Sequence, residues 1–104
     1  MSGISYNPEF SDVDNDGYVS GTVSVTAVAT EAKVGANRLV GREGITITNN
    51  GPDKVYYGPS GVTAASGDVL LKNQFISLPL GETIGIYVVC DTGKTATVIV
   101  QELA

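Results

Sequence analysis

The feature that most constrains this chain is a two-residue alternation of apolar and polar side chains, which recurs in short stretches between turn-forming residues. In residues 45–48 isoleucine alternates with threonine, so the isoleucines lie on one face of an extended strand and the threonines on the other. Residues 49–53, Asn-Asn-Gly-Pro-Asp, follow as a turn, because Asn and Gly tolerate positive φ and Pro cannot continue a strand ladder. Val55 and Tyr57 resume the alternation. The first prediction is therefore a sheet whose strands are connected by short hairpins.

The same alternation covers most of residues 19–104. Residues 19–27 place the valines, Gly21 and Ala27 on one face and Ser or Thr on the other, and residues 76–80 repeat the pattern. Residues 91–94, Asp-Thr-Gly-Lys, form a short hairpin connection between two further stretches. The inward side chains of those two stretches are Ile84, Ile86, Val88 and Cys90 in the first, and Ala96, Val98 and Val100 in the second.

Seven or eight short strands result from this pattern, and no stretch supports a helix of ordinary length. The 13 glycines among 104 residues agree with many tight turns, and frequent Val, Ile and Thr favour pleated, half-buried strands. A chain of this length forms one domain with a core that needs no disulfide. We therefore predict an all-β fold, a single antiparallel β-sandwich of jelly-roll type over residues 19–104, preceded by an extended N-terminal arm over residues 1–18.

The arm differs in composition from the rest of the chain. Residues 1–18 hold four of the eleven acidic residues and only isolated hydrophobic side chains without sustained periodicity. Such a segment is either a loose terminus or a segment that is ordered against a neighbouring subunit. Its large aromatic side chains favour the second interpretation slightly, and the interface candidates in it are Ile4, Tyr6 and Phe10.

Charge and hydropathy exclude two classes of partner. The six basic residues are scattered among eleven acidic ones, for a net charge of −5, and phosphate contacts need clustered Lys and Arg, so we expect no nucleic-acid binding. No apolar stretch approaches the roughly 20 residues that span a bilayer, so no membrane partner is expected. The first residues, MSGISYNPEF, lack the basic and apolar regions of a secretory signal. We therefore expect assembly in a cytoplasm.

Catalytic equipment is scarce in this sequence. The chain contains no histidine, which excludes Ser-His and Cys-His nucleophiles and histidine-bearing metal sites. The single cysteine, Cys90, ends an apolar stretch and is expected to be a buried free thiol. No enzyme activity is expected. Seven carboxylates sit mostly in apparent turns, where a solvated surface position is the default: Glu31, Glu43, Asp53, Asp68, Glu82, Asp91 and Glu102.

One segment resembles a cation-binding loop. Asp12, Asp14, Asp16 and Ser20, with Gly17 between them, match oxygen-bearing positions of an EF-hand calcium loop. The twelfth position, which should hold a bidentate carboxylate, is Val23, so the best outcome is a weak calcium site. The alternative is an exposed acidic turn, in which Asp and Asn bond to their own backbone. No other cofactor is expected.

Several further residues are candidates for an interface. Tyr56 and Tyr57 are neighbours on one strand and therefore point to opposite sides, so one of them belongs to the core. The outward tyrosine, together with Tyr87, is expected to line a subunit contact, or alternatively a glycan site. Ile99 interrupts the polar face of the last strand, which suggests that a neighbour covers part of it. Arg38 is expected to pair with an acidic residue or with turn carbonyls, or alternatively to contact a neighbouring protein.

Residues 37–65 also resemble a known group of proteins. An entry that contains Asn37 and Arg38, an Ile-x-Ile-x-Asn-Asn strand, a Val-Tyr-Tyr-Gly strand and a Gly-Val-Thr turn resemble those of small β-sandwich virion proteins of tailed bacteriophages. The segments LPLGETIGIYVVC and TATVIVQEL look like the rest of the same domain, so that the resemblance covers residues 19–103.

The resemblance implies a non-enzymatic structural role in a virion that is assembled in the host cytoplasm. Members of this group serve as capsid decoration proteins, head fibres, or tail and baseplate attachments. For this chain a capsid-attached decoration protein or head fibre is the favoured role, with the major capsid protein or another virion protein as partner. A homotrimer is the oligomer that the resemblance implies. The alternatives are a tail or baseplate adaptor and a glycan-binding β-sandwich module with weak calcium dependence.

Overall fold

A computed structural model describes residues 17–104 of the chain. These residues form strands and connections and contain no helix, so none is long and apolar enough to cross a membrane. The predicted arm lies outside the described residues except for Gly17 and Tyr18, and Tyr18 already pairs with Leu103. The strands are β2 (Tyr18–Val25), β3 (Thr30–Glu31), β4 (Gly44–Pro52), β5 (Val55–Gly58), β6 (Asp68–Leu70), β7 (Phe75–Leu78), β8 (Tyr87–Val89) and β9 (Ala96–Leu103).

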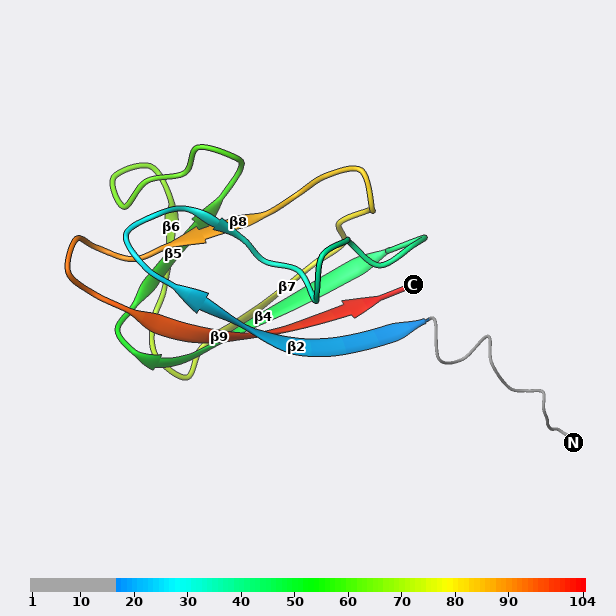
Figure 1. The fold of residues 1–104 in the computed structure, drawn as a ribbon, viewed down its shortest axis with the longest axis horizontal. Helices are drawn as coiled ribbons and strands as arrows, with labels where there is room; N and C mark the ends of the chain where they lie inside the picture. Colours follow the sequence, from blue (N-terminus) through cyan, green and yellow to red (C-terminus); the bar gives the residue numbers. More distant parts are fainter. Residues whose placement is uncertain (1–16) are drawn as a thin grey trace, which may run out of the picture.

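Two antiparallel sheets of four strands form the sandwich, which confirms the predicted fold (Figure 1). One sheet has the order β2-β9-β4-β7 and the other the order β3-β8-β5-β6. The chain folds back on itself between β5 and β6, so that β2 pairs with β9, β3 with β8, β4 with β7 and β5 with β6. Rolling up this long hairpin brings β4 beside β9 and β5 beside β8. That arrangement is the jelly roll.

The prediction of short hairpins between neighbouring strands was wrong. Among the consecutive strands of the described region, only β5 and β6 pair with each other. The predicted turn at residues 49–53 was wrong for its first four residues, because β4 runs to Pro52, with a bulge between Asn49 and Pro52, and Pro52 pairs with Ala96. Residues 53–54, between β4 and β5, and the turn at residues 91–94 each carry the chain from one sheet to the other. Alternation reports which face of a strand is buried, and both layers of a sandwich bury one face. It therefore gives no information on whether the next strand lies in the same layer.

The core lies between the two sheets and consists of the inward side chains that the alternation predicts. Ile45 and Ile47 of β4 are 1% and 0% exposed, and Val98 and Val100 of β9 are fully buried. The opposite layer contributes residues such as Val55, Leu70 and Val88. Cys90 is a buried free thiol, as expected. Its Sγ lies 3.8 Å from the carbonyl oxygen of Val25, and burial, followed by the charges of Asp53 and Asp91, raises its pKa.

Two residues assigned to the inward face are exposed. Ile84 is 57% exposed, because it precedes β8, which begins only at Tyr87. Ala27 is also exposed, because β2 ends at Val25 and the chain then turns toward the other sheet. In both cases the alternation was extended past the end of the strand, where it no longer determines the direction of a side chain.

Candidate functional site

The outer face of the β2-β9-β4-β7 sheet carries no charged side chain. Successive residues of a strand point to opposite faces, and the inward residues are identified by their burial. We call the outward set the uncharged face. It consists of Tyr18, Ser20, Thr22, Ser24, Gly44, Thr46, Thr48, Asn50, Phe75, Ser77, Thr97, Ile99, Gln101 and Leu103.

Strand register orders the uncharged face into rows. Thr22 lies opposite Ile99, Ile99 opposite Thr48, and Thr48 opposite Phe75. In the next row the hydroxyls of Thr46 and Ser77 lie 2.8 Å apart and are hydrogen-bonded. The Gln101 amide donates to the Tyr18 hydroxyl at 2.9 Å. These contacts restrain four of the polar side chains, which therefore lose less side-chain entropy when a partner covers them.

Apolar side chains are spread over this otherwise polar face. Phe75, Tyr18 and Leu103 are 64%, 47% and 45% exposed. Ile99 lies between them on the central strand β9 and is half-buried. A surface with aromatic side chains and without charges can be covered by a partner at a lower desolvation cost than a charged surface, and depletion of charge is typical of the centre of protein interfaces. Of the predicted interface residues, Ile99 belongs to the uncharged face.

The predicted tyrosines lie on the other sheet. The pairing of β5 with β8 places Tyr56 opposite Val89 and Gly58 opposite Tyr87, so Tyr56 and Tyr87 share the outer face. The Tyr56 hydroxyl donates to Asp91 at 3.3 Å, and the Lys54 ammonium lies 5.9 Å from the centre of the Tyr56 ring. One face of that ring is therefore already occupied by a cation within the chain.

Tyr57 points to the opposite side from Tyr56 and packs against the core, which agrees with the prediction that one of the two tyrosines belongs to it. The ring also lines a shallow apolar depression of about 250 Å³, together with Leu80, Ile84 and Ile86. The depression is therefore a feature of the edge of the core rather than of the uncharged face.

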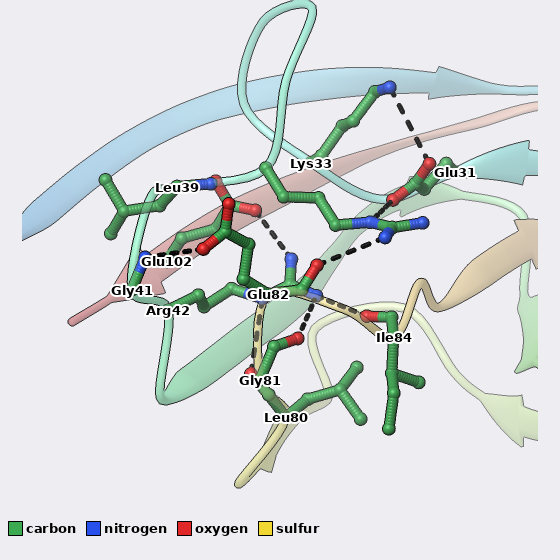
Figure 2. A network of polar contacts seen from close by, with 11 residues as sticks. Glu31, Lys33, Leu39, Gly41, Arg42, Leu80, Gly81, Glu82, Ile84 and Glu102 are labelled. Atoms are coloured by element: carbon green, nitrogen blue, oxygen red, sulfur yellow. Dashed lines mark hydrogen bonds and ion pairs between the residues drawn. The ribbon is translucent and has the colours of Figure 1, made fainter.

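A polar network closes one end of the sandwich, where residues 31–43 meet residues 80–86 and β9 (Figure 2). Arg42 and Glu102 form its centre, and both side chains are 0% exposed. The Arg42 Nη1 donates to Glu102 at 2.7 Å. The remaining Arg42 donors bond to the carbonyl oxygens of Leu80 at 3.2 Å, Gly81 at 3.1 Å and Ile84 at 2.5 Å. The second Glu102 oxygen accepts from the Leu39 N–H at 3.3 Å. This arrangement ties two loops to β9.

The assignment of Glu102 to a solvated turn was wrong. Glu102 continues the inward series of Ala96, Val98 and Val100 in β9 and is fully buried. The signal was present in the sequence, because the same two-residue step that identifies the valines reaches Glu102. A carboxylate in that position needs a cation, and the cation is Arg42.

Arg38 pairs with Glu31, as expected, at the outer edge of the same network. Its Nε lies 2.5 Å from the Glu31 carboxylate, and its Nη1 donates to the Glu82 carbonyl at 3.1 Å. Gly85 packs closely beside this pair, because a Cβ there would lie 2.5 Å from Arg38 Nη2 and the Arg38 side chain would have to shift. The adjoining open depression of about 260 Å³ is lined by Glu31, Lys33 and Arg38, with Glu82 at its edge. Glu31 pairs there with both Arg38 and Lys33, and the Glu82 carboxylate accepts from the Gly41 N–H at 2.8 Å.

The Glu31–Arg38 pair should make stability depend on pH. Burial alone raises the pKa of Glu31, but the hydrogen bond from Arg38 and the charges of Arg38 and Lys33 outweigh it and lower the pKa below 4.5. A carboxyl with a lowered folded-state pKa adds stability above its unfolded pKa, and that stability is lost as the pH falls through the folded pKa. We expect Arg38→Met to lower the unfolding free energy at about pH 7 and to have a smaller effect at about pH 3. Urea unfolding at both values, with the exposed Lys94→Met as control, tests this; an effect of equal size at both would contradict it.

The proposed calcium ligands Asp12, Asp14 and Asp16 lie outside the described residues, as do Ile4, Tyr6 and Phe10. Ser20 lies within β2, opposite Gln101, with its side chain on the uncharged face. Within residues 17–104 no three His, Cys, Asp or Glu side chains come together as a metal site would require. The calcium loop stays a prediction.

Comparison with known proteins does not assign a function, so the fold and the outer faces of the two sheets are the basis for a functional assignment. No model of a protein family matches the chain, and no curated protein sequence is significantly similar to it.

Proposed function

We propose that this protein is a non-enzymatic structural component of a tailed-phage virion, a capsid-attached decoration protein or head fibre. The observation that carries the proposal is the uncharged face, on which Phe75, Ile99 and Leu103 lie among Ser, Thr, Asn and Gln side chains. The jelly roll supplies a rigid platform for such a face, because β2, β4 and β9 are long and paired along their length.

Charge distribution determines which surface the virion would cover. All six basic residues of the chain lie in the described region, and none belongs to the uncharged face. The outer face of the other sheet carries the Glu31–Arg38 pair and the Asp91-bonded Tyr56. Covering charged groups costs desolvation that imperfect pairing does not repay, whereas an uncharged face avoids that cost. The uncharged face is therefore the contact surface in this proposal. The outer face of the β3-β8-β5-β6 sheet remains in solvent.

Particle binding by surface variants tests the proposal. Particles of the encoding phage are purified and analysed for this chain by mass spectrometry. In a second step, particles prepared without this protein are mixed with the purified protein and sedimented. We expect Thr48→Lys and Phe75→Lys to weaken binding by about tenfold or more, because each buries a charge on the uncharged face. The matched control is Val69→Lys, which adds the same charge at a 50% exposed position of β6 in the other sheet.

Two results would contradict the proposal. Purified particles without this chain would exclude a virion component, and equal binding by Phe75→Lys and Val69→Lys would exclude the uncharged face as the contact. Electron microscopy of particles that carry the labelled protein distinguishes a capsid position from a tail or baseplate position, since an adaptor would differ from a decoration protein only in location.

A further inference from the structure

Strand β2 forms an edge of its sheet within residues 17–104, and half of its backbone groups point away from β9. The Ala104 N–H donates to the Gly17 carbonyl at 2.9 Å. Because hydrogen-bonded pairs alternate along an antiparallel ladder, the odd-numbered residues of β2 bond to β9. Ser20, Thr22 and Ser24 therefore present their N–H and C=O groups to the free edge. In the described part of the chain β2 has no strand partner other than β9.

The β2 edge is unlike the other three edges of the sandwich. β3 has 2 residues, β6 has 3 and β7 has 4, and shortness of this kind is one way in which proteins prevent sheets from joining edge to edge. β2 has 8 residues, YVSGTVSV, in continuous register with β9. It contains no charge, no proline and no bulge, which are the other protective devices. A long, regular and unprotected edge is suited to pairing with another strand.

We propose that β2 pairs antiparallel with β2 of a second copy of this chain, so that the two four-stranded sheets join into one sheet of eight strands. A two-fold axis at Gly21 or Thr22 sets even-numbered residues opposite even-numbered residues, which is the register that the free N–H and C=O groups require. The same register places outward side chains beside outward ones and inward beside inward ones, because the period of a strand is two.

The occupant is a second copy because β2 is complementary to itself. The chain carries a net charge of −5, but identical β2 strands bring no like charges opposite each other, whereas like charges in that position would oppose pairing. The pairing is isologous and closes after two copies. It also joins the two uncharged faces into one continuous surface. The inference depends only on the β2 edge and is independent of the virion assignment.

Amide hydrogen exchange on the unmodified protein tests the pairing directly. We expect the amides of Ser20, Thr22 and Ser24 to exchange slowly, and their exchange to become faster on dilution. The amides of Gly21 and Val23 are the internal control, because they bond to β9 and should be protected at every concentration. Light scattering on the same samples should give a mass twice that of the chain.

Variants separate the edge from the face. Thr22→Pro removes one donor at the free edge and leaves the bonds between β2 and β9 intact, since proline is tolerated at an outward N–H of an edge strand. We expect it to be monomeric and folded. Thr48→Lys lies in the same row of the uncharged face but away from the edge, and it should remain dimeric. The proposed virion contact can therefore fail while the dimer persists, or the reverse.

Three results would overturn the inference. One is a wild-type monomer with fast exchange at Ser20, Thr22 and Ser24. A second is a mass of three chains, because β2 pairing closes at two. The third is slow exchange at these amides in a monomer, which would place another segment of the same chain on the edge. If Thr22→Pro does not fold, the exchange rates of the unmodified protein decide between these results.

Discussion

Replacing Arg42 by methionine is expected to destabilise the fold by about 3–5 kcal/mol, the usual cost of removing one partner of a buried ion pair. The substitution leaves the fully buried Glu102 carboxylate without its cation. It also removes the donors to the carbonyl oxygens of Leu80, Gly81 and Ile84. Domains are commonly stable by only about 5–15 kcal/mol, so a large part of the folding free energy is lost. Denaturant unfolding followed by circular dichroism measures the change.

Two control variants identify the cause. Arg38→Met removes the half-buried partner of Glu31, and its effect should be smaller, because solvent partly screens that pair. The double variant Arg42→Met, Glu102→Leu removes both buried charges and should recover part of the loss, since no unpaired charge remains. An Arg42→Met protein as stable as wild type would show that the pair is not structurally necessary. A double variant no better than the single one would assign the loss to the three carbonyl contacts.

The second large effect is expected for Asn49→Ala. This substitution should lower the free energy of unfolding by about 2–4 kcal/mol, because it leaves buried groups without hydrogen bonds. Asn49 is 0% exposed. Its Nδ2 donates to the carbonyl oxygens of Asp53 at 2.9 Å and Leu70 at 3.0 Å, and its Oδ1 accepts from the Gly51 N–H at 2.7 Å. The side chain thus links β4 of one sheet to β6 of the other across the turn that connects the layers.

The neighbouring residue is the matched control for this prediction. Asn50 is exposed on the uncharged face, and Asn50→Ala should change stability by less than about 0.5 kcal/mol. Thermal and urea unfolding of the two variants compare the same chemical change at a buried and an exposed position. Equal losses of stability in the two variants would mean that the three hydrogen bonds of Asn49 do not account for its effect.

The two-residue alternation predicts which positions are buried but not which polar residues occupy them, as Arg42, Glu102 and Asn49 show. The alternation correctly predicted the all-β class and the inward positions of Ile45, Ile47, Val98 and Val100. Continued by one step, it also places Asn49 and Glu102 inward. Their polarity nevertheless suggested a turn, because a buried polar residue is identifiable only when its partners are known. Those partners come from loops distant in sequence.

The sequence by itself determined the fold class, the buried face of most strands and the free buried thiol of Cys90. The tertiary structure alone decided that residues 53–54 and residues 91–94 cross between sheets and that, within residues 17–104, β2 is left as a long open edge. It also decided that the outward residues of four strands combine into one uncharged face. The physical reason is that side-chain direction along a strand is a local property with a period of two, whereas the choice of neighbouring strand depends on how the whole chain rolls up.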